Sequence, residues 1–400
     1  MRILHISTRL ILGGSQENTV LSCEGQARLG HEVHLAFGPI YGPEGSLLER
    51  VEAFRSPSGK RITTHTVPDL VRELRPAGDF DAYGQLKRLI RDLRPDIVHT
   101  HSSKAGILGR GAAWAVMSST RRPMGIIHTV HGPPFHAYET PWRNRLYVLS
   151  ERWAAKRCHT IVSVADAMTK QFRAQGIGRP EQFVTVYSGM EVGPFVHAAP
   201  GERRDEVRAA LGLERGDLVV GTVARLAELK GHDDLLSALA SDLRRHPGLK
   251  LLWVGDGWKR RQLEARIGEL GISGQVLMTG LVPPERVPGL IRAMDILAHP
   301  SYREGLPRTV PQALLTGVGV VANDVDGTGE VIRDQETGRL VKPGDIAALR
   351  EAILWMLEDE PRRRATADAG RKWCLERFSA ERMVADLEKV YAAALGAQRP

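Results

Sequence analysis

Short apolar runs alternate with helical patterns throughout the first half of the sequence. Runs typical of buried strands occur at Arg2–Ser7, Glu32–Ala36, Ile97–His101, Gly125–Val130, Thr160–Val164 and Phe183–Val186. Helical patterns separate them at Ser15–Leu29, Tyr83–Leu93, Ala105–Val116, Pro141–Arg157 and Ala167–Gln175. This alternation predicts a parallel sheet covered by helices on both faces. Residues 38–80 contain many Gly and Pro, so we expect loops there, with one short strand around Ile62–Val67.

The same alternation begins again after the Pro- and Gly-containing segment Gly189–Gly201. Strands are predicted at Val219–Val223, Lys250–Val254, Val276–Thr279, Met294–His299, Val318–Ala322 and Gly338–Val341. Helices are predicted between them, including Asp233–Ser241, Lys259–Leu270, Glu285–Ala293, Thr309–Leu315 and Ile346–Glu358. The pattern therefore predicts two doubly wound α/β domains with parallel sheets, over residues 1–190 and 195–377. The last helical pattern, Ala380–Leu395, is not clearly part of either sheet.

Length and composition agree with two domains of a soluble protein. A chain of 400 residues exceeds the usual size of a single core. No uninterrupted apolar run reaches the roughly 18–20 residues needed to span a bilayer, and the first residues read as a strand rather than a signal peptide. Three widely spaced cysteines lack metal-ligand spacing. We therefore expect a cytoplasmic protein.

Basic residues concentrate in the first half of the chain. Residues 1–190 carry a net charge of +9 and residues 191–400 carry −1, which together give the +8 of the whole chain. A phosphorylated partner or the inner face of an anionic membrane would match this excess, and dispersed solvated arginines would explain it equally well. Nucleic acid is not expected as a partner, because aromatic residues make up only 6% of the chain.

Three segments at predicted strand ends in the second half carry candidate chemistry. Arg225 and Lys230 follow a strand, and two cations five residues apart can straddle a diphosphate. Glu304 follows another strand, where a carboxylate can accept hydrogen bonds from sugar hydroxyls. The helix start after Pro307 can direct N–H groups at a phosphate. For each residue the plain alternative is a charge on a solvent-facing loop.

Further candidates follow strands in the first half. Gly13 and Gly14 open a helix directly after the first strand, which suits close approach of a ligand to the backbone. His131 ends a strand beside a glycine, and His101 and Lys104 mark another strand-to-helix corner. Lys104 there could hold an acceptor phosphate, or could be an ordinary surface lysine.

Two motifs are set aside as weak. Asp324-Val325-Asp326 imitates a metal-binding pair, but no further ligand set accompanies it, so we expect no metal. Gly255-Asp256-Gly257 is a turn after a strand and is poor evidence for a phosphate loop. We therefore expect neither a metal nor another cofactor.

Taken in order, these segments resemble glycosyltransferase family 4, whose members have the GT-B fold of two facing doubly wound domains. The resemblance spans nearly the whole chain. It rests on Gly13-Gly14, residues 129–132, Arg225 with Lys230-Gly231, residues 254–257, and residues 304–308 followed by Ala313-Leu314.

The resemblance implies a retaining, metal-independent transfer of a sugar from a nucleotide-diphospho-sugar to a hydroxyl acceptor. The implied donor is a UDP-sugar, and the implied setting is cell-envelope, exopolysaccharide or glycolipid assembly, with a saccharide or lipid-linked acceptor. The terminal helix, residues 378–397, would cross back onto the first domain. The first domain would bind the acceptor and the second the donor.

The resemblance also implies roles for individual residues. Arg225 and Lys230 would hold the diphosphate, Glu304 would contact the donor sugar, and His131 would lie beside the reacting centre. His101 and Lys104 are the acceptor-side candidates. The donor-binding set is Gly13, Gly14, Gly305, Leu306, Pro307, Gln312 and Val282.

The sequence departs from the family pattern at two positions. Gln312 replaces the second Glu that usually binds the nucleotide ribose, which predicts affinity weaker by about 1 kcal/mol because a neutral amide is the weaker acceptor. Ser188-Gly189-Met190-Glu191 stands where Asn-Gly-x-Asp is frequent, and we interpret this as tolerated variation. Two other functions fit the same pattern: a sugar-nucleotide-binding protein without transfer activity, and a sugar-nucleotide epimerase.

Overall fold

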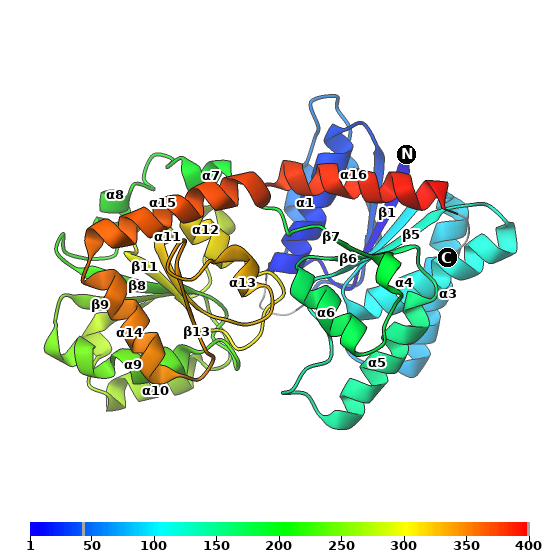
Figure 1. Cartoon of the computed structure of the whole chain (residues 1–400). Helices are drawn as coiled ribbons and strands as arrows, with labels where there is room; N and C mark the ends of the chain where they lie inside the picture. The colour runs from blue at the N-terminus through cyan, green and yellow to red at the C-terminus, as the bar shows by residue number, and fades with distance from the viewer. Residues whose placement is uncertain (42–44, 398–400) are drawn as a thin grey trace. The chain divides into compact units, whose positions relative to one another are not determined.

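The computed structural model describes residues 1–41 and 45–397, and these form two compact units. Unit 1 comprises residues 1–190 and 380–400, and unit 2 comprises residues 191–379. Figure 1 shows the elements of both units along the chain. Each unit is a parallel α/β domain, as the alternating pattern predicts.

Unit 1 is built on a seven-stranded sheet with the strand order β3-β2-β1-β4-β5-β6-β7, in which every neighbouring pair is parallel. The strands are β1 (Arg2–Ser7), β2 (Glu32–Phe37), β3 (Ile62–Thr66), β4 (Ile97–His101), β5 (Gly125–Val130), β6 (Thr160–Ser163) and β7 (Phe183–Thr185). The helices are α1 (Gly14–Arg28), α2 (Leu48–Ala53), α3 (Pro76–Leu93), α4 (Ser103–Thr120), α5 (Pro141–Ala155), α6 (Asp166–Ala174) and α16 (Ala380–Gly396).

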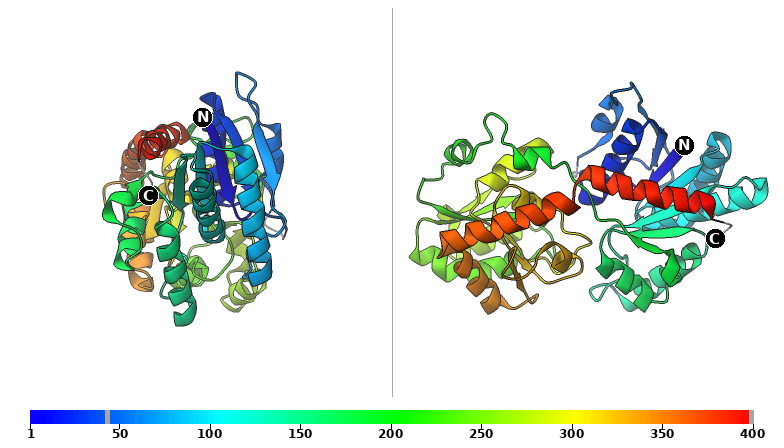
Figure 2. Two further views of the ribbon diagram at one scale, coloured as in Figure 1. Left: turned by 90° about the vertical axis from the view of Figure 1, so that its right-hand side faces the viewer. Right: turned by 45° about the horizontal axis from the view of Figure 1, so that its top comes forward.

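The C-terminal helix α16 completes the core of unit 1. It packs against α1 and β5, and Figures 1 and 2 show it lying along α1 over the sheet. Its buried residues join apolar side chains from the sheet and α1 in one cluster. That cluster contains Ile3, Leu21, Ile97, Ile127, Val162, Val186, Ala380, Met383, Val384, Leu387, Val390, Tyr391 and Ala394. The expected return of the terminal helix to the first domain is confirmed.

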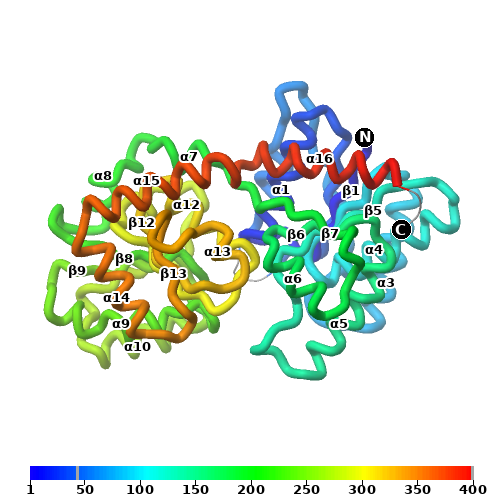
Figure 3. The backbone as a smooth tube through the Cα atoms, viewed as in Figure 1, coloured from blue at the N-terminus to red at the C-terminus, as the bar shows by residue number. Residues whose placement is uncertain are grey.

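Unit 2 repeats the architecture with a six-stranded parallel sheet in the order β10-β9-β8-β11-β12-β13. The strands are β8 (Leu218–Val223), β9 (Leu249–Val254), β10 (Val276–Met278), β11 (Ile296–His299), β12 (Gly319–Asn323) and β13 (Arg339–Val341). The helices are α7 (Gly193–Val196), α8 (Arg204–Ala210), α9 (His232–Arg245), α10 (Arg260–Glu269), α11 (Val287–Arg292), α12 (Thr309–Leu315), α13 (Thr328–Val331), α14 (Ile346–Leu357) and α15 (Glu360–Arg377). The alternation can be followed along the backbone in Figure 3.

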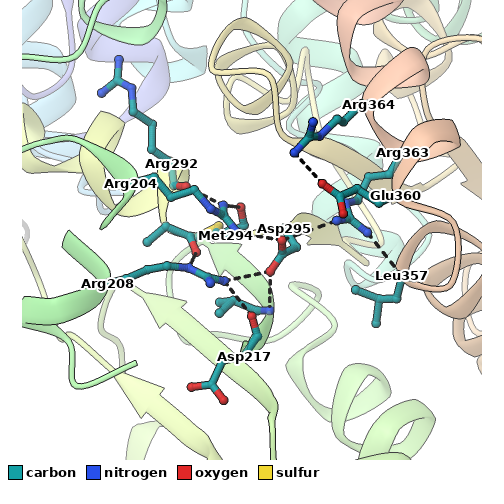
Figure 4. A network of polar contacts seen from close by, with 12 residues as sticks. Arg204, Arg208, Asp217, Arg292, Met294, Asp295, Leu357, Glu360, Arg363 and Arg364 are labelled. Atoms are coloured by element: carbon teal, nitrogen blue, oxygen red, sulfur yellow. Dashed lines mark hydrogen bonds and ion pairs between the residues drawn. The ribbon is translucent and has the colours of Figure 1, made fainter. Parts of the chain in front are cut away.

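Asp295, the residue before β11, anchors two helices of unit 2. Its carboxylate lies 2.7 Å from Arg204 and 2.9 Å from Arg208 of α8, and 3.6 Å from Arg363 of α15 (Figure 4). Other N–H groups of these arginines donate to backbone carbonyls, including those of residues 292–294, 356 and 357. This network joins α8 and α15 to the sheet.

The loop-rich interpretation of residues 38–80 is partly wrong. Helix α2 lies inside it, and α3 begins at Pro76 rather than Tyr83. Strand β3 is present at the expected place. Residues 42–44 of this predicted loop lie outside the described residues. The missed first turns of α3, Pro76–Ala82, bury only Ala82 and so show little apolar periodicity.

Candidate active site

An ion pair between Lys230 and Glu304 is the centre of the candidate site in unit 2. The Lys230 Nζ lies 2.6 Å from Oε1 of Glu304. Lys230 is in the loop after β8, and Glu304 is in the loop after β11. These neighbouring strands are where the strand order reverses, with β9 and β10 on one side and β12 and β13 on the other. Ligands of open parallel sheets bind at this kind of position, beyond the carboxyl ends of the strands.

The Glu304 carboxylate is strongly stabilised in its ionised form. Burial alone would raise the pKa of Glu304, but Lys230 and His299 beside it lower that pKa well below its ordinary range. His299 Nε2 lies 3.1 Å from the same oxygen as Lys230. The carboxylate is 14% exposed, so it remains accessible to a ligand. The site therefore presents a fixed, charged hydrogen-bond acceptor.

Close backbone contact places Lys230 beside Glu304. Gly231, the residue before α9, has φ of 74°, and a Cβ there would lie 2.0 Å from the Pro300 carbonyl oxygen. The Tyr302 N–H also donates to the Leu229 carbonyl at 2.8 Å. Glycine is therefore required at position 231, both for its conformation and for the approach of the two loops.

Arg225 lies in the same loop as Lys230. Its guanidinium carbon is 5.8 Å from the centre of the Trp258 ring, and the Trp258 indole donates to Glu228 at 2.6 Å. Backbone bonds fix this loop to the turn after β9, since the Leu226 N–H donates to the Asp256 carbonyl at 3.0 Å. Both predicted diphosphate-binding cations therefore belong to one braced loop.

The other predicted donor-site residues of unit 2 surround Glu304 in sequence. Gly305 accepts a hydrogen bond from the Gly327 N–H at 3.1 Å, and the Glu304 N–H donates to Asp326 Oδ2 at 2.7 Å. Leu306, Pro307 and Gln312 are buried, whereas Val282 is partly exposed in the loop after β10. Asp326 of the apparent metal motif thus braces the Glu304 loop.

The candidate residues of unit 1 form a second group at the equivalent point of its sheet. His101 ends β4, and its Nδ1 lies 3.1 Å from Nε2 of His131, which follows β5. His5 of β1 and His99 of β4 join them, with His5 Nδ1 2.9 Å from His101 Nε2. Neither His5 nor His99 is among the site residues predicted from sequence. Residues 99 and 101 share one face of β4 because side chains alternate along a strand, and the register of β1 and β5 with β4 places His5 and Thr129 on that face.

Lys104 and the glycine pair lie elsewhere in unit 1. The Lys104 ammonium contacts Asp79 of α3 at 2.5 Å and also bonds the Glu73 carbonyl. The lysine considered for an acceptor phosphate is therefore already paired with a residue of the overlooked part of α3. Gly13 and Gly14 are exposed at the start of α1.

Among residues 1–41 and 45–397, one histidine group has ligand atoms close enough for a metal ion: His5, His99 and His101, all buried. Over the same residues, no helix combines the length and the apolar character needed to cross a bilayer.

The two parallel-sheet units, each with its polar group at a strand-order reversal, define the GT-B class of glycosyltransferases. Residues 203–373 match the family of glycosyl transferases group 1, and residues 13–189 match the glycosyl transferase 4-like domain. The chain belongs to the family 4-like glycosyltransferases and is a transferase enzyme.

Relatives and solved structures agree with this assignment. The 2-deoxystreptamine N-acetyl-D-glucosaminyltransferase of Streptomyces fradiae is 30% identical, over 77% of this chain and 73% of the relative. The UDP-Gal:alpha-D-GlcNAc-diphosphoundecaprenol alpha-1,3-galactosyltransferase of Escherichia coli is 26% identical, over 74% of each chain. The crystal structure of Anabaena Alr3699/HepE in complex with UDP and glucose has a TM-score of 0.81 at 20% identity, covering 98% of this chain and 100% of that one.

Proposed function

We propose that the protein is a retaining glycosyltransferase that moves a sugar from a UDP-sugar to a hydroxyl acceptor in cell-envelope, exopolysaccharide or glycolipid assembly. The observation that carries the proposal is the Lys230–Glu304 pair at the strand-order reversal of unit 2. In this pair, a cation that can bind the diphosphate lies next to a carboxylate that can bind the sugar. The site residues and the donor and acceptor roles of units 2 and 1 are part of this proposal.

The proposed chemistry stabilises the leaving group. As the bond between the anomeric carbon and the phosphate oxygen breaks, its electron pair passes to the diphosphate. Arg225 and Lys230 stabilise that growing charge more in the transition state than in the ground state. Glu304, kept ionised by its neighbours, accepts hydrogen bonds from donor-sugar hydroxyls and orients the ring.

Retention follows if the acceptor attacks from the face that the phosphate leaves. The acceptor oxygen then bonds to the anomeric carbon, and its proton passes to the departing phosphate oxygen. A retaining glycosidase would instead use a carboxylate nucleophile about 5–5.5 Å from a second carboxyl. Glu304 is poorly suited to attack, because the Lys230 ammonium and His299 already bind one of its oxygens.

The relatives support the donor and acceptor classes. One relative is named for a UDP-galactose donor and a diphosphoundecaprenol-linked acceptor, and one similar structure contains UDP and glucose. Because a lipid-linked acceptor lies in a membrane, we place the reaction at the cytoplasmic face of the membrane.

Substitution of Arg225 and Glu304 tests the proposal. Arg225→Ala and Glu304→Ala should each lower transfer from UDP-sugars by on the order of 100- to 1000-fold, while each variant remains folded at neutral pH. Arg261→Ala, an exposed arginine of α10, is the matched control. Near-normal turnover in both site variants would contradict the proposal. Tight UDP-sugar binding without transfer would favour the binding protein, and sugar isomerisation without an acceptor would favour the epimerase.

A specific surface supports membrane contact as a second part of the function. Trp142, Leu146, Leu149 and Trp153 of α5 are 41–62% exposed. At about 100° per residue they lie within about 60° of one another, along about 16 Å of the helix. Cations flank this apolar stripe on both sides: Arg145, Arg152 and Lys156 on one, and Arg143 and Arg157 on the other.

An aromatic and leucine stripe between two rows of cations suits an anionic bilayer surface. The net charge of +9 on residues 1–190 adds long-range attraction. We propose that α5 lies in the membrane interface, with its buried face on α4.

Vesicle co-sedimentation tests this surface. The wild type should bind vesicles of phosphatidylglycerol and phosphatidylcholine, and binding should weaken as salt rises. The double variant Trp142→Ser/Leu149→Gln should lose on the order of 100-fold in affinity. Leu375→Gln, a leucine of α15 with similar exposure of 43%, should bind normally. Unchanged vesicle binding by the double variant would contradict membrane docking. So would a dimer that the wild type forms without vesicles and that the double substitution disrupts.

A further inference from the structure

Six polar side chains, including His131 at one end, form a continuous hydrogen-bonded chain in unit 1. The chain begins at Tyr391 of α16, passes through Gln26 of α1 and His5 of β1, and reaches His101 of β4 and then His131. A branch runs from Tyr391 to His99. All members except His131 are at most 1% exposed.

The chemistry of Gln26 gives the chain a direction. Its amide nitrogen donates to the Tyr391 hydroxyl at 2.8 Å, so its oxygen faces His5 Nε2, 2.7 Å away. An amide oxygen only accepts, and therefore the proton of this bond belongs to His5 Nε2. His5 is neutral because burial lowers its pKa to about 4. Its Nδ1 must then be the acceptor.

The same donor and acceptor argument applies to His101 and then to His131. His5 Nδ1, 2.9 Å from His101 Nε2, can accept only if His101 carries its proton on Nε2. His101 is also neutral, since burial and the neighbouring histidines hold its pKa well below the ordinary range. Its Nδ1 therefore accepts from His131 Nε2 at 3.1 Å. Each histidine in the series has its proton on Nε2.

The branch through Tyr391 is consistent with this direction. The Tyr391 hydroxyl accepts from Gln26, and its other partner is Nδ1 of His99, 2.7 Å away. The buried Tyr391 proton is hydrogen-bonded only if this Nδ1 accepts it. His99 Nε2 then donates to the Thr129 hydroxyl at 2.7 Å. Thr129 is two residues before His131, so both branches converge on the same strand end.

We infer that Gln26, His5 and His101 are positioning residues that fix the tautomer of His131, with its proton on Nε2 and its lone pair on Nδ1. This inference rests on the proposed function, in which His131 lies beside the reacting centre. A single tautomer keeps the N–H and the lone pair of this imidazole at fixed ring atoms, without any rearrangement during the reaction.

The same histidines do not form a ready metal site. All six ring nitrogens of His5, His99 and His101 already have protein partners. A metal ion would have to break several of these bonds in a buried layer.

The direct test is nitrogen-15 NMR of the histidine side chains in the full-length protein. Two-bond ring correlations distinguish the two neutral tautomers of each imidazole. We expect His5, His101 and His131 to carry the proton on Nε2 at pH 7.5. A proton on Nδ1 of His131, or rapid exchange between its tautomers, would overturn the inference.

Substitution tests the role of the chain in catalysis. Gln26→Met removes the acceptor for His5 at similar size, and should leave His131 as a mixture of tautomers. The kcat for sugar transfer should fall about tenfold, as expected for one misdirected hydrogen bond, with KM for the UDP-sugar within about threefold. Gln26→Glu restores an acceptor and should restore the Nε2-protonated tautomer of His131. Unchanged kcat and tautomer in Gln26→Met would contradict the inference even if this variant is less stable.

Two controls separate the explanations. His34 and His65 form a similar pair, 3.0 Å apart, on β2 and β3 outside the chain, and His65→Gln should not change kcat. Stoichiometric zinc binding that disappears in His5→Gln would instead make the cluster a metal site. If the tautomers are as expected but no UDP-sugar is turned over, the proposed function fails while the tautomer assignment stands.

Discussion

Lys230 and His299 bind the same oxygen of the Glu304 carboxylate and stabilise its ionised form. In the unfolded chain the pKa of Glu304 returns to about 4.3. The folded pKa is lower than the unfolded one, so this carboxylate stabilises the fold fully above about pH 4.3. That contribution is lost as the pH falls toward the folded pKa.

We therefore predict an acid-dependent difference between wild type and Glu304→Gln. Between pH 5 and pH 3 the free energy of unfolding of the wild type should fall faster than that of the variant, by up to about 1.4 kcal/mol per pH unit. Urea denaturation, monitored by tryptophan fluorescence at each pH, measures this difference in the free energy of unfolding. Glu285→Gln, at an exposed position, should follow the wild type. Parallel pH curves for wild type and Glu304→Gln would show that the ion pair does not contribute to stability.

Gln312 gives a second prediction at the scale of one residue. It is 8% exposed in α12, where the resemblance expects a ribose-binding Glu. Gln312→Glu should tighten UDP binding about fivefold, because a charged acceptor binds ribose hydroxyls more strongly by about 1 kcal/mol.

Calorimetric titration of UDP and GDP measures this change, with Gln262→Glu on the exposed face of α10 as control. Tighter UDP binding with unchanged nucleotide preference supports the ribose role. If the variant instead prefers a different nucleotide, Gln312 determines specificity rather than affinity.

The rule that ligands bind beyond parallel strand ends, together with the family resemblance, selected Lys230 and Glu304 from sequence, although they are 74 residues apart. It did not select His299, because a buried histidine at the end of an apolar strand reads as core until its neighbour is known. The ion pair of Lys104 could not be predicted from sequence for another reason. Its partner Asp79 lies in helix turns whose residues are mostly exposed.

At the scale of elements, α16 is fastened to unit 1 by polar as well as apolar contacts. Tyr391 is fully buried, accepts from Gln26 and donates to His99. Tyr391→Phe keeps the ring but leaves these two buried groups without a partner. We predict a loss of about 1–3 kcal/mol in the free energy of unfolding.

Denaturant unfolding of unit 1 measures this loss. Tyr41→Phe is the matched control, since that hydroxyl also makes one side-chain bond, to Glu73 at 2.8 Å, but on an exposed tyrosine. The control should change stability by less than about 0.5 kcal/mol. Equal effects of the two substitutions would mean that the buried network adds nothing to the packing of α16.

The elements that the sequence predicted well are those with long apolar periodicity, such as the strands of both sheets. Helix α15 was not predicted, because its 18 residues are rich in charge and bury few apolar side chains. It packs on α12, α14 and β12, and its Arg363 reaches Asp295 and two backbone carbonyls of α14. No local pattern reports such long-range polar contacts.

At the scale of the whole molecule, we expect the proposed transfer to need no divalent ion, because in this proposal Arg225 and Lys230 supply the positive charge that a metal would bring to the diphosphate. We predict that EDTA leaves the transfer rate within about twofold of the untreated enzyme. Added Mg²⁺ or Mn²⁺ should likewise have little effect on initial rates. Loss of activity in EDTA that is recovered with one of these ions would contradict the metal-independent mechanism.

The return of α16 to unit 1 also affects the order in which the protein folds during synthesis. Unit 2 is encoded by one uninterrupted stretch, residues 191–379, whereas the core of unit 1 lacks Tyr391 and its neighbours until the ribosome has passed them. Domains usually fold in the order of their synthesis. Unit 2 is synthesised later but can complete its folding first. Unit 1 can complete its core, including the contacts of the histidine layer with Tyr391, only after α16 has been synthesised. A ribosome that stops before residue 380 would thus release a folded unit 2 with an incomplete unit 1.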